Sequence, residues 1–589
     1  MKSLNAKQLY NAIINGAIKV IENKKGLNSI NVFPVADGDT GTNLASLMNT
    51  LIEETKEADN PKAVLNNVAD AAINGARGNS GIIFAQYFNG MMMNLDNKNE
   101  INLIDLTLSF NGGVSYAYKA ISNPIEGTMI TLMRQLADEL NNIKDKADNI
   151  IDALDHAFNN LQQGLKNTTN QLKVLKDNKV VDAGAKGFVH FVEGIIEYLK
   201  TGNLKTYKVS AETIGLTHDH NAEAINFRFC TEALISGVNL NPEEIKKSVS
   251  KLGDSLVVAG NPNKLRLHIH TNEPHQFYAS LRLFGKIEQQ KVDDMIKQHE
   301  LATSKKYKIA LVTDSIADLP MDYVEQHQIV MVPLNLIIEG SNYYDKLTVT
   351  SDTFYQMMDD LKVYPTSAQP TLKSIENLFS FLGSYYDEII AVTVSSQMSG
   401  TNNVFNQAAE KFKNSKTKIK VIDSKRNSGA QGLIVMEAAE AIASGKKFDE
   451  VIKVAEKAVS KAQIYVSVKT LKYMVRSGRV SKTTGLIGKL VNLKPVIGID
   501  KDGKGIIADK GLSLKSSFNK IKKHVTDALV AGGIKKYAIV HANALDRAKE
   551  YQQAFSKLIG KEPAYVIDIS SIVAMSAGIG TVAIAYLEE

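Results

Sequence analysis

The sequence has a single cysteine, no block of basic residues and only one uncharged run that approaches the length of a membrane span. One cysteine excludes an intrachain disulfide and is typical of a reducing compartment. The uncharged run, residues 569–587, is rich in Ser, Thr and Gly, which favours a strand–turn–helix of a folded domain over a bilayer span. Residues 1–25 have the spacing of an amphipathic helix and lack the pattern of a signal peptide. We therefore expect a cytoplasmic protein without stable membrane insertion.

Charge and aromatic residues exclude one class of partner. Lys and Arg number 69 against 63 Asp and Glu, so the net charge of +6 is spread thinly over 589 residues. Tyr and Phe are not interleaved with Arg in a pattern that binds RNA. We expect no nucleic-acid partner.

The chain is long enough for three or four domains, and its pattern changes twice. Residues 1–200 alternate amphipathic helical patterns with polar turns, and residues 206–300 form a small α+β pattern. Residues 307–589 alternate short apolar strands with helices, which predicts an α/β region with a parallel sheet. The strands expected in that region are 309–312, 389–393, 419–422, 464–468 and 537–541.

The segment Asn31-Val-Phe-Pro-Val-Ala-Asp-Gly-Asp-Thr-Gly-Thr-Asn43 carries the strongest chemical signal. Asp37 and Asp39 stand two residues apart in a loop too rich in Gly and Thr for a helix or strand interior, so both carboxylates can turn toward one point. Carboxylate oxygens are the ligands that Mg²⁺ prefers, and glycines let backbone amides approach phosphate. An Asp-Gly pair also suits a solvated turn. The apolar run before the acidic residues favours an anchored loop with a metal and phosphate site.

Three further Gly-punctuated turns precede apolar helical patterns, at residues 75–83, 124–131 and 181–187. The N-terminus of a helix presents free N–H groups and a positive partial charge to an anion. Each turn alone is a weak signal, because helix N-termini favour such residues anyway. Together with the acidic loop they favour a phosphate-binding site.

These motifs resemble the DhaL-type nucleotide-binding domain of dihydroxyacetone kinases, in the version found in bacterial fatty acid kinases. The resemblance covers residues 1–200 and implies an eight-helix barrel that holds ATP and two Mg²⁺ ions at its loop end. It implies that Asp37 and Asp39 ligate Mg²⁺ and act in catalysis. Asn31 stands near a position that is acidic in the glycerone-kinase relatives. The nucleotide-binding residues that the resemblance implies are Asn31, Thr40, Thr42, Asn43, Asn79, Ser80, Gly81, Glu126, Gly127, Thr128, Asp182 and Gly184.

The middle region, 206–300, contains a candidate zinc set. His268 and His270 stand two apart in an expected strand, so both imidazoles project from one face. Cys230 ends another expected strand, and one Cys with two His is a reasonable zinc set with an open fourth position. The alternative is that the histidines lie on the surface and Cys230 in the core. The surrounding segments resemble the middle domain of the catalytic component of fatty acid kinases, which implies a required metal site and a catalytic role for both histidines.

Residues 307–589 resemble the DegV family of fatty-acid-binding proteins. The matching pieces lie in family order at 312–315, 318–320, 365–371, 394–401, 422–425, 476–479 and 493–495. The resemblance implies an acyl tunnel whose carboxylate end is held by hydroxyl and amide groups, although turn capping is the alternative for any single serine. Ala368 and Ser576 stand where the family commonly has a serine and a histidine. The lipid-binding candidates are Thr366, Ser367, Ser399, Gly400, Thr401 and Ser576.

The favoured hypothesis is an ATP- and Mg²⁺-dependent kinase that converts long-chain fatty acids to acyl phosphates for phospholipid metabolism, with Zn²⁺ as a further candidate ion. The partners expected are separate DegV-family carriers, an acyltransferase and a second copy of the chain in a homodimer. Two alternatives remain. One is a non-catalytic lipid-binding or lipid-transfer protein. The other is a glycerone-type kinase, whose small polar substrate would have no use for an acyl tunnel.

Overall fold

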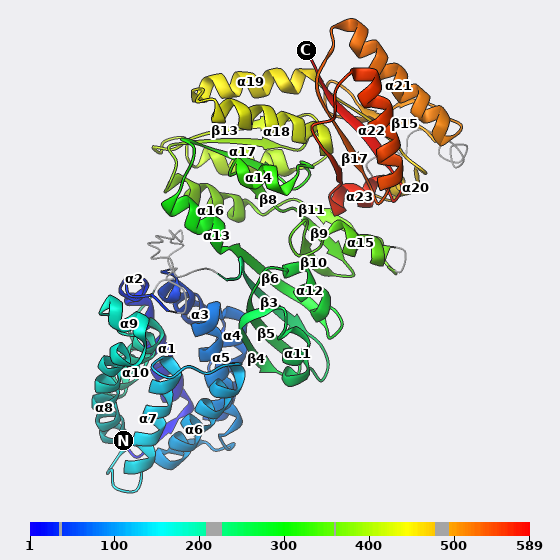
Figure 1. Ribbon diagram of the computed structural model, residues 1–589. Helices are drawn as coiled ribbons and strands as arrows, with labels where there is room; N and C mark the ends of the chain where they lie inside the picture. Colours follow the sequence, from blue (N-terminus) through cyan, green and yellow to red (C-terminus); the bar gives the residue numbers. More distant parts are fainter. Residues whose placement is uncertain (34–37, 208–225, 359–360, 478–493) are drawn as a thin grey trace. The chain divides into compact units, whose positions relative to one another are not determined.

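The computed structural model describes the chain except for residues 34–37, 208–225, 359–360 and 478–493 (Figure 1). The described residues divide into two compact units, Met1–Ser304 and Lys305–Glu589. The expected fold class is confirmed: a helical N-terminal region, a small α+β region and a C-terminal α/β region. The exact limits of three domains at 1–200, 206–300 and 307–589 stay a prediction. Among the described helices, none combines the length and the apolar character that a bilayer crossing requires.

Eight helices of 15 or more residues form a closed ring in the first unit (Figure 1). Each long helix packs against the next one along the chain, and the last packs against the first. They are α1 (Ala6–Glu22), α3 (Thr40–Glu54), α4 (Pro61–Gly75), α5 (Gly78–Met93), α6 (Leu103–Ala120), α7 (Met129–Ile143), α8 (Ile150–Gln171) and α10 (Ala183–Thr201). The same region also contains two short helices, α2 (Lys24–Asn28) and α9 (Lys173–Asn178). It further contains the antiparallel strands β1 (Ser3–Asn5) and β2 (Glu100–Asn102).

Amphipathic spacing and capping residues explain this ring. On α7, apolar residues three and four apart from Met129 to Leu140 are buried, as a helix with one core-facing side requires. Asn5 and Asn102 begin α1 and α6 as capping boxes, in which the side chain accepts from the third helical amide. Aromatic side chains from α5 and α10 are buried between the helices. The centroids of the Phe84 and Phe191 side-chain rings lie 5.1 Å apart.

An antiparallel sheet in the order β4-β5-β3-β6 follows the helical ring in the first unit. Its strands are β3 (Phe229–Ser236), β4 (Gly253–Asn261), β5 (Lys264–Thr271) and β6 (Lys286–Asp294), and its helices are α11 (Pro242–Val249), α12 (Pro274–Leu281) and α13 (Met295–Thr303). Strand β6 was not expected, because its sequence KIEQQKVDD lacks an apolar alternation. The sheet packs against α4 and α5, and the buried guanidinium of Arg266 donates to the carbonyl groups of Ile73 and Asn74. The polar side of β5 therefore faces the helical ring.

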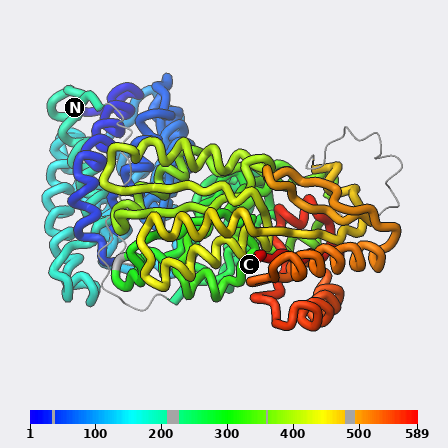
Figure 2. The backbone as a smooth tube through the Cα atoms, turned by 90° about the horizontal axis from the view of Figure 1, so that it is seen from above, coloured from blue at the N-terminus to red at the C-terminus, as the bar shows by residue number. Residues whose placement is uncertain are grey.

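The second unit contains a four-stranded parallel sheet in the order β13-β12-β7-β8. Helix α18 is buried along most of its length and packs against this sheet and a second one, and α18 and α19 lie side by side (yellow in Figure 2). The elements of this region are β7 (Ile309–Asp314), β8 (Val330–Val332), β12 (Glu388–Thr393), β13 (Lys418–Asp423), α14 (Met321–Gln326), α16 (Leu372–Gly383), α17 (Thr401–Glu410), α18 (Ser428–Ala443) and α19 (Phe448–Lys461).

The second sheet has six strands in the order β16-β15-β14-β19-β17-β18, and a three-stranded sheet has the order β10-β9-β11. The strands of these sheets are β9 (Asn335–Ile338), β10 (Ser341–Tyr344), β11 (Thr366–Ala368), β14 (Ala462–Ser467), β15 (Val496–Ile499), β16 (Gly505–Asp509), β17 (Ile534–His541), β18 (Val566–Asp568) and β19 (Val582–Glu588). The remaining helices are α15 (Ser351–Met358), α20 (Lys472–Arg476), α21 (Leu514–Ala531), α22 (Leu545–Ile559) and α23 (Ser571–Ala577).

The second unit differs from the sequence prediction in two details. Strands β14 and β17 do not join the parallel sheet but pair antiparallel with β19. A short apolar strand buried on both faces has the same sequence pattern in either kind of pairing, so the sequence could not separate the two sheets. The uncharged run 569–587 forms α23 followed by β19, which reverses the expected order of strand and helix.

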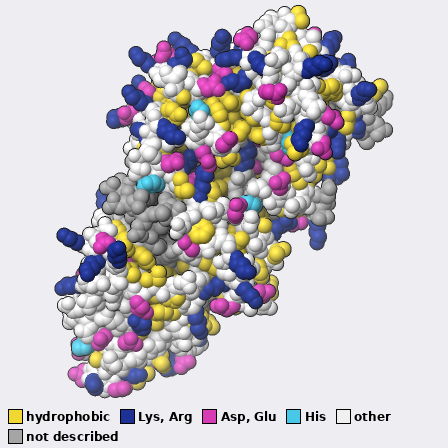
Figure 3. Space-filling model, in the orientation of Figure 1, with side chains coloured by type: hydrophobic (Ala, Val, Ile, Leu, Met, Phe, Trp, Pro, Cys, Tyr) yellow, Lys and Arg dark blue, Asp and Glu magenta, His cyan; other side chains and the backbone are white. Residues whose placement is uncertain are grey.

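On the face drawn in Figure 3, basic and acidic side chains are interspersed rather than gathered.

Candidate functional site

One cleft in the first unit brings the helix N-termini of the ring to the middle-domain sheet. Helix α3 begins at Thr40, directly after Asp39, and α5 begins at Gly78. Each helix start directs backbone N–H groups and a positive partial charge toward its end. The residues that line the cleft are Asn31, Phe33, Asp39, Thr40, Asn43, Gly78, Asn79, Ser80, Cys230, Glu232, His268, His270 and Lys291. Asp37, the other predicted magnesium ligand, lies outside the described residues.

Local contacts fix the start of each of these two helices. The hydroxyl of Thr40 donates to the side-chain oxygen of Asn31 at 2.6 Å, and both residues are buried. Gly78 has a φ of 59°, in the left-handed region that favours glycine. A Cβ added there would lie 2.5 Å from the side-chain nitrogen of Asn43. The glycine therefore lets α5 begin in contact with α3.

The N-termini of two more helices, α7 and α10, meet at Asp182. The buried carboxylate of Asp182 accepts hydrogen bonds from the backbone amides of Met129 and Ala185, at the starts of α7 and α10. Burial raises the pKa of Asp182 to about 6, although these two hydrogen bonds lower it. A Cβ added to Gly184 would lie 3.1 Å from the hydroxyl of Ser80. The predicted phosphate and nucleoside segments thus lie side by side.

Some predicted nucleotide-binding residues do not line the cleft. Thr42 exchanges two hydrogen bonds with the side chain of Asn28. The carboxylate of Glu126 is held by Tyr118, Thr131 and Arg134. Gly81, Gly127 and Thr128 are also absent from the lining residues of this cleft. The nucleotide contacts expected of these residues stay predictions.

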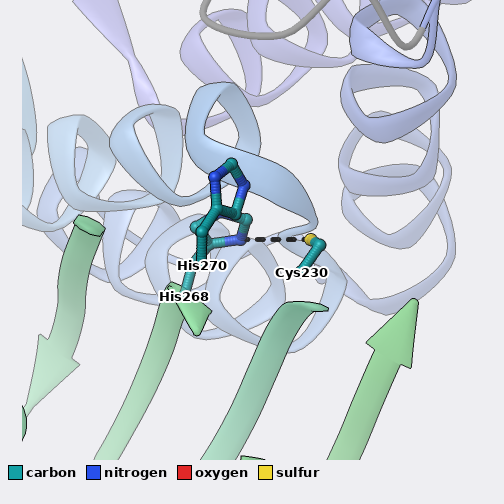
Figure 4. A group of neighbouring side chains, drawn as sticks. All are labelled: Cys230, His268 and His270. Carbon is teal, nitrogen blue, oxygen red and sulfur yellow. Dashed lines mark hydrogen bonds between the residues drawn. The ribbon is translucent and has the colours of Figure 1, made fainter. Parts of the chain in front are cut away.

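The candidate zinc residues come together at the same cleft (Figure 4). The sulfur of Cys230 lies 3.9 Å from Nδ1 of His268, and the possible ligand atoms of all three residues lie within 4.8 Å of one another. Both histidines are buried, with exposed fractions of 2% and 9% for His268 and His270. They face the helical ring, so the alternative of surface histidines is wrong.

The donor chemistry of this group fits Zn²⁺. One thiol and two imidazoles match the ligands of zinc sites that keep an open position. Burial lowers the pKa of His268 and raises the pKa of the Cys230 thiol. Within the described residues, Nε2 of His268 is buried and has no hydrogen-bond partner. A cation at this point would supply the missing interaction and favour the thiolate.

Carboxylates stand behind both histidines. Nδ1 of His268 lies 3.7 Å from Glu232, and Nδ1 of His270 lies 3.6 Å from Asp254. The contact with His270 lowers the pKa of Asp254. Burial would raise the pKa of Glu232, but His268, Lys291 and Arg77 lower it. Carboxylates in such positions orient the rings of metal-binding histidines.

The cleft also contains Glu232 and Lys291, which the sequence motifs did not identify as site residues. They face each other on neighbouring strands, β3 and β6, and Lys291 forms an ion pair of 2.6 Å with Asp293. Burial alone would lower the pKa of Lys291, but Asp293 and Glu232, followed by Cys230 and Asp39, raise it. The sequence held only one signal for them, the polar residues two apart in Cys230–Glu232 and in β6.

The second unit contains a large, mainly apolar cavity between its sheets. Its empty volume is about 1360 Å³ including the open mouth, and its lining includes Ser367, Ser399, Gly400 and Ser576. Thr366 and Thr401 do not line it, but the hydroxyls of Ser399 and Thr401 lie 2.8 Å apart. A Cβ added to Gly400 would lie 1.7 Å from Oε1 of Gln369, so the segments of Ser367 and Ser399 adjoin.

Comparisons with known proteins match three successive segments of the chain. Family models match residues 34–197 as a DAK2 domain, 226–302 as the FakA-like middle domain of fatty acid kinases, and 308–589 as the uncharacterised DegV family. The chain therefore combines a DAK2 domain, a FakA-like middle domain and a DegV-family domain, the architecture that its motifs implied.

Individual relatives match parts of the chain. Uncharacterized proteins of Staphylococcus aureus strains USA300 and NCTC 8325 are each 31% identical over 312 residues, or 51% of this chain and 57% of theirs. The match thus spans little more than half the length of these curated relatives. A fatty-acid-binding DegV family protein of Thermus thermophilus is 25% identical, with a TM-score of 0.45, over 48% of this chain and 100% of that one. DegV of Bacillus subtilis, described as a fatty acid binding protein, is 26% identical with the same TM-score and coverage.

Proposed function

We propose that this chain is a fatty acid kinase, which transfers the γ-phosphoryl group of ATP to the carboxylate of a long-chain fatty acid. The observation that carries the proposal is the cleft in which Asp39 and the starts of α3 and α5 face Cys230, His268 and His270. The matches to a DAK2 domain and to a FakA-like middle domain support a kinase. Kinase and lipid-binding modules would stand on one chain.

Each part of the cleft has a role in this proposal. Asp37 and Asp39 would hold Mg²⁺, with two ions expected from the family resemblance. Asn43, Asn79 and Ser80, at the starts of α3 and α5, would contact phosphate oxygens. Asp182 and Gly184 would border the nucleoside. Cys230, His268 and His270 would hold Zn²⁺, which would add positive charge beside the transferring group.

The reaction needs positioning more than acid–base chemistry. A carboxylate oxygen of the fatty acid would form a bond to the γ-phosphorus, while the bond from that phosphorus to the bridging oxygen breaks and ADP leaves. A carboxylate is already ionised at pH 7, so no proton has to be removed. The residues of the cleft would orient the fatty acid and ATP. They would also offset the repulsion between the two anions.

The cavity of the second unit is the proposed place of the acyl chain. Burying each methylene contributes about 0.8 kcal/mol, so a long chain is held mainly by apolar lining. Ser367, Ser399 and the amides that follow Ser399 would hold the carboxylate. Separate DegV-family carriers, an acyltransferase that uses the acyl phosphate, and a second copy of the chain in a homodimer are the further partners that we propose.

A hydroxylamine trap tests the proposed reaction directly, because acyl phosphates react with hydroxylamine to give stable hydroxamates. The purified chain, Mg-ATP and a long-chain fatty acid should yield the acyl hydroxamate, and Asp39→Asn should lower its rate at least about 100-fold. Asp96→Asn, in an exposed loop with a side chain 84% exposed, is the matched control. ATP consumption without hydroxamate would contradict the fatty acid as acceptor.

A second candidate, a non-catalytic lipid-binding protein, is favoured by one observation. Ser576 lines the cavity where the DegV family commonly has a histidine, so the C-terminal unit departs from the family at the carboxylate end. In that case the acyl chain would co-purify with the protein, while neither ATP consumption nor hydroxamate would exceed the level of Asp39→Asn.

A further inference from the structure

We propose that Lys291 is a catalytic residue whose ammonium group contacts the phosphoryl group during its transfer. This inference rests on the proposed kinase function and adds a cationic side chain from outside the motifs of the helical ring. Nothing in the DAK2-like motifs of the helical ring includes this lysine, because it comes from the last strand of the middle-domain sheet.

The position of Lys291 carries the inference. Lys291 lines the same cleft as Asp39, Ser80 and His270. Among the described residues that line the cleft, it is the one lysine or arginine. The lysine therefore lies in the cleft that the starts of α3 and α5 share with the candidate zinc group.

Lys291 is held by one contact along its own strand and by pairing with the neighbouring strand. Its Nζ lies 2.6 Å from Oδ2 of Asp293, and its backbone pairs with Glu232 of β3. The buried hydroxyl of Tyr278 donates to the backbone oxygen of Glu232 at 2.5 Å and approaches that of Lys291 at 3.4 Å. The side chain keeps an exposed fraction of 36%, so a ligand in the cleft can reach it. Such preorganisation is what electrostatic stabilisation of a transition state requires.

The chemistry of the proposed reaction explains why a cation is needed at this point. A fatty acid carboxylate and a nucleoside triphosphate are both anionic, and Glu232 and Asp39 add further negative charge to the cleft. Lysine is a compact point charge that suits phosphate oxygens, and it can exchange one carboxylate partner for another anion without moving its backbone.

The competing explanation is structural: Lys291 would only neutralise Asp293 and Glu232. The same strand offers a matched control for it. Lys286 pairs with Glu288 at 3.2 Å with the same two-residue spacing, near the opposite end of β6, and it does not line the cleft. If Lys291 has a purely structural role, Lys291→Met and Lys286→Met should have the same effect on ligand binding and on the rate.

The test compares wild type, Lys291→Met, Lys291→Arg and Lys286→Met as full-length chains, each checked for thermal unfolding. Calorimetry measures the affinity for Mg-ADP with and without aluminium fluoride, which mimics the phosphoryl group in transfer. Hydroxamate formation from ATP and a long-chain fatty acid is measured in parallel.

We expect wild type and Lys286→Met to bind ADP at least tenfold more tightly when aluminium fluoride is present. Lys291→Met should lose this gain, keep its affinity for Mg-ADP alone within about threefold, and form hydroxamate about 100-fold more slowly. Lys291→Arg should recover part of the gain, because it restores the charge. Retention of the fluoride-dependent gain and of the rate in Lys291→Met would overturn the inference while leaving the fatty acid kinase intact.

The two proposals fail separately. If wild type forms no hydroxamate but binds ADP and aluminium fluoride in a manner that depends on Lys291, the fatty acid is the wrong acceptor and the role of Lys291 stands. If Lys291→Met unfolds, Lys291→Arg provides the test instead. A folded Lys291→Arg chain without the fluoride-dependent gain would overturn the inference that the positive charge at this position contacts the phosphoryl group. Absence of that gain in wild type overturns the inference as well.

Discussion

The carboxylate of Glu232, on the middle-domain strand β3, accepts a hydrogen bond of 2.7 Å from the backbone amide of Gly78, the first residue of α5. Its other oxygen lies 3.8 Å from Nη1 of Arg77, and its side chain is only 1% exposed. The same carboxylate approaches His268 at 3.7 Å. One buried charge therefore joins the start of α5 to the candidate zinc group.

Removal of this carboxylate should destabilise the first unit. Glu232→Ala leaves the buried amide of Gly78 without its acceptor, which costs about 1–3 kcal/mol. It also removes the carboxylate beside Arg77, whose side chain is 31% exposed. Glu232→Gln keeps an acceptor for the amide and should cost less. Urea or thermal unfolding of the full chain measures both.

Glu288 on β6 provides the control for this change. Its side chain is 35% exposed and pairs with Lys286, so Glu288→Ala should change the free energy of unfolding by at most about 1 kcal/mol. Equal effects of Glu232→Ala and Glu288→Ala would show that the bond to Gly78 contributes nothing to the contact between ring and sheet.

The pKa of Asp182 predicts a pH dependence of stability. Its folded pKa is raised from 3.8 to about 6 by burial, so the folded state binds the proton more tightly than the unfolded chain. The favourable contribution is complete below about pH 3.8 and is lost as the pH rises through about 6. Asp182→Asn keeps an acceptor for the capping amides without the charge. Relative to wild type it should gain stability between pH 4 and pH 7.5, by at most ~3 kcal/mol.

Measured unfolding free energies of both chains across this range check the sign. Asp177→Asn is a suitable control, since Asp177 is exposed on α9. A difference between wild type and Asp182→Asn that stays constant from pH 4 to pH 7.5 would contradict the buried, proton-binding carboxylate.

Zinc content should depend jointly on the residues of the Cys230 group. Cys230→Ser and His270→Ala each remove one of three ligands, so we expect both variants to lose most of the metal after dialysis against a weak chelator. Elemental analysis of the purified chains measures this. His275→Ala removes a histidine of the same domain that pairs with Glu273 outside the group, and it should retain the metal. Equal metal content in all four chains would return Cys230 and both histidines to a structural role.

The helical ring and the starts of its helices could be predicted because their signals are local. Amphipathic spacing, Asn caps and Gly-rich turns lie within a few residues of one another, as at Asn102 and Gly78. The meeting of Cys230 with His268 was also within reach, since strands with two-residue periodicity place side chains on known faces.

The remaining features depend on which distant segments meet. Lys291 has no local signal, because its meaning comes from the pairing of β6 with β3 and from the helical ring on the other side of the cleft. The buried environment of Arg266 and His268 is likewise set by α4 and α5. For β14 and β17, the partner strand β19 lies at the C-terminal end of the chain, and an apolar strand does not encode the direction of its partner.

The hydroxyl groups around Gly400 should decide whether the second unit retains an acyl chain. Ser399 and Ser367 both line the cavity, and Gly400 contacts Gln369, so the two serines come from adjoining segments. Ser399→Phe places a ring into the cavity and should expel a co-purified fatty acid, as native mass spectrometry of the full chain would detect. Ser396→Phe is the control, because Ser396 is exposed and does not line the cavity.

Ser576→His tests the polar end from the other side. Ser576 lies on α23 and lines the cavity, and an imidazole there could donate a charge-assisted hydrogen bond to the carboxylate. We expect this variant to bind a long-chain fatty acid about tenfold more tightly than wild type in calorimetry, and Ser399→Phe to bind at least about tenfold more weakly. If wild type takes up no fatty acid and Ser576→His does not either, the cavity is not the acyl site. The substrate would then have to reach the kinase cleft on a separate carrier, and hydroxamate formation would depend on adding that carrier.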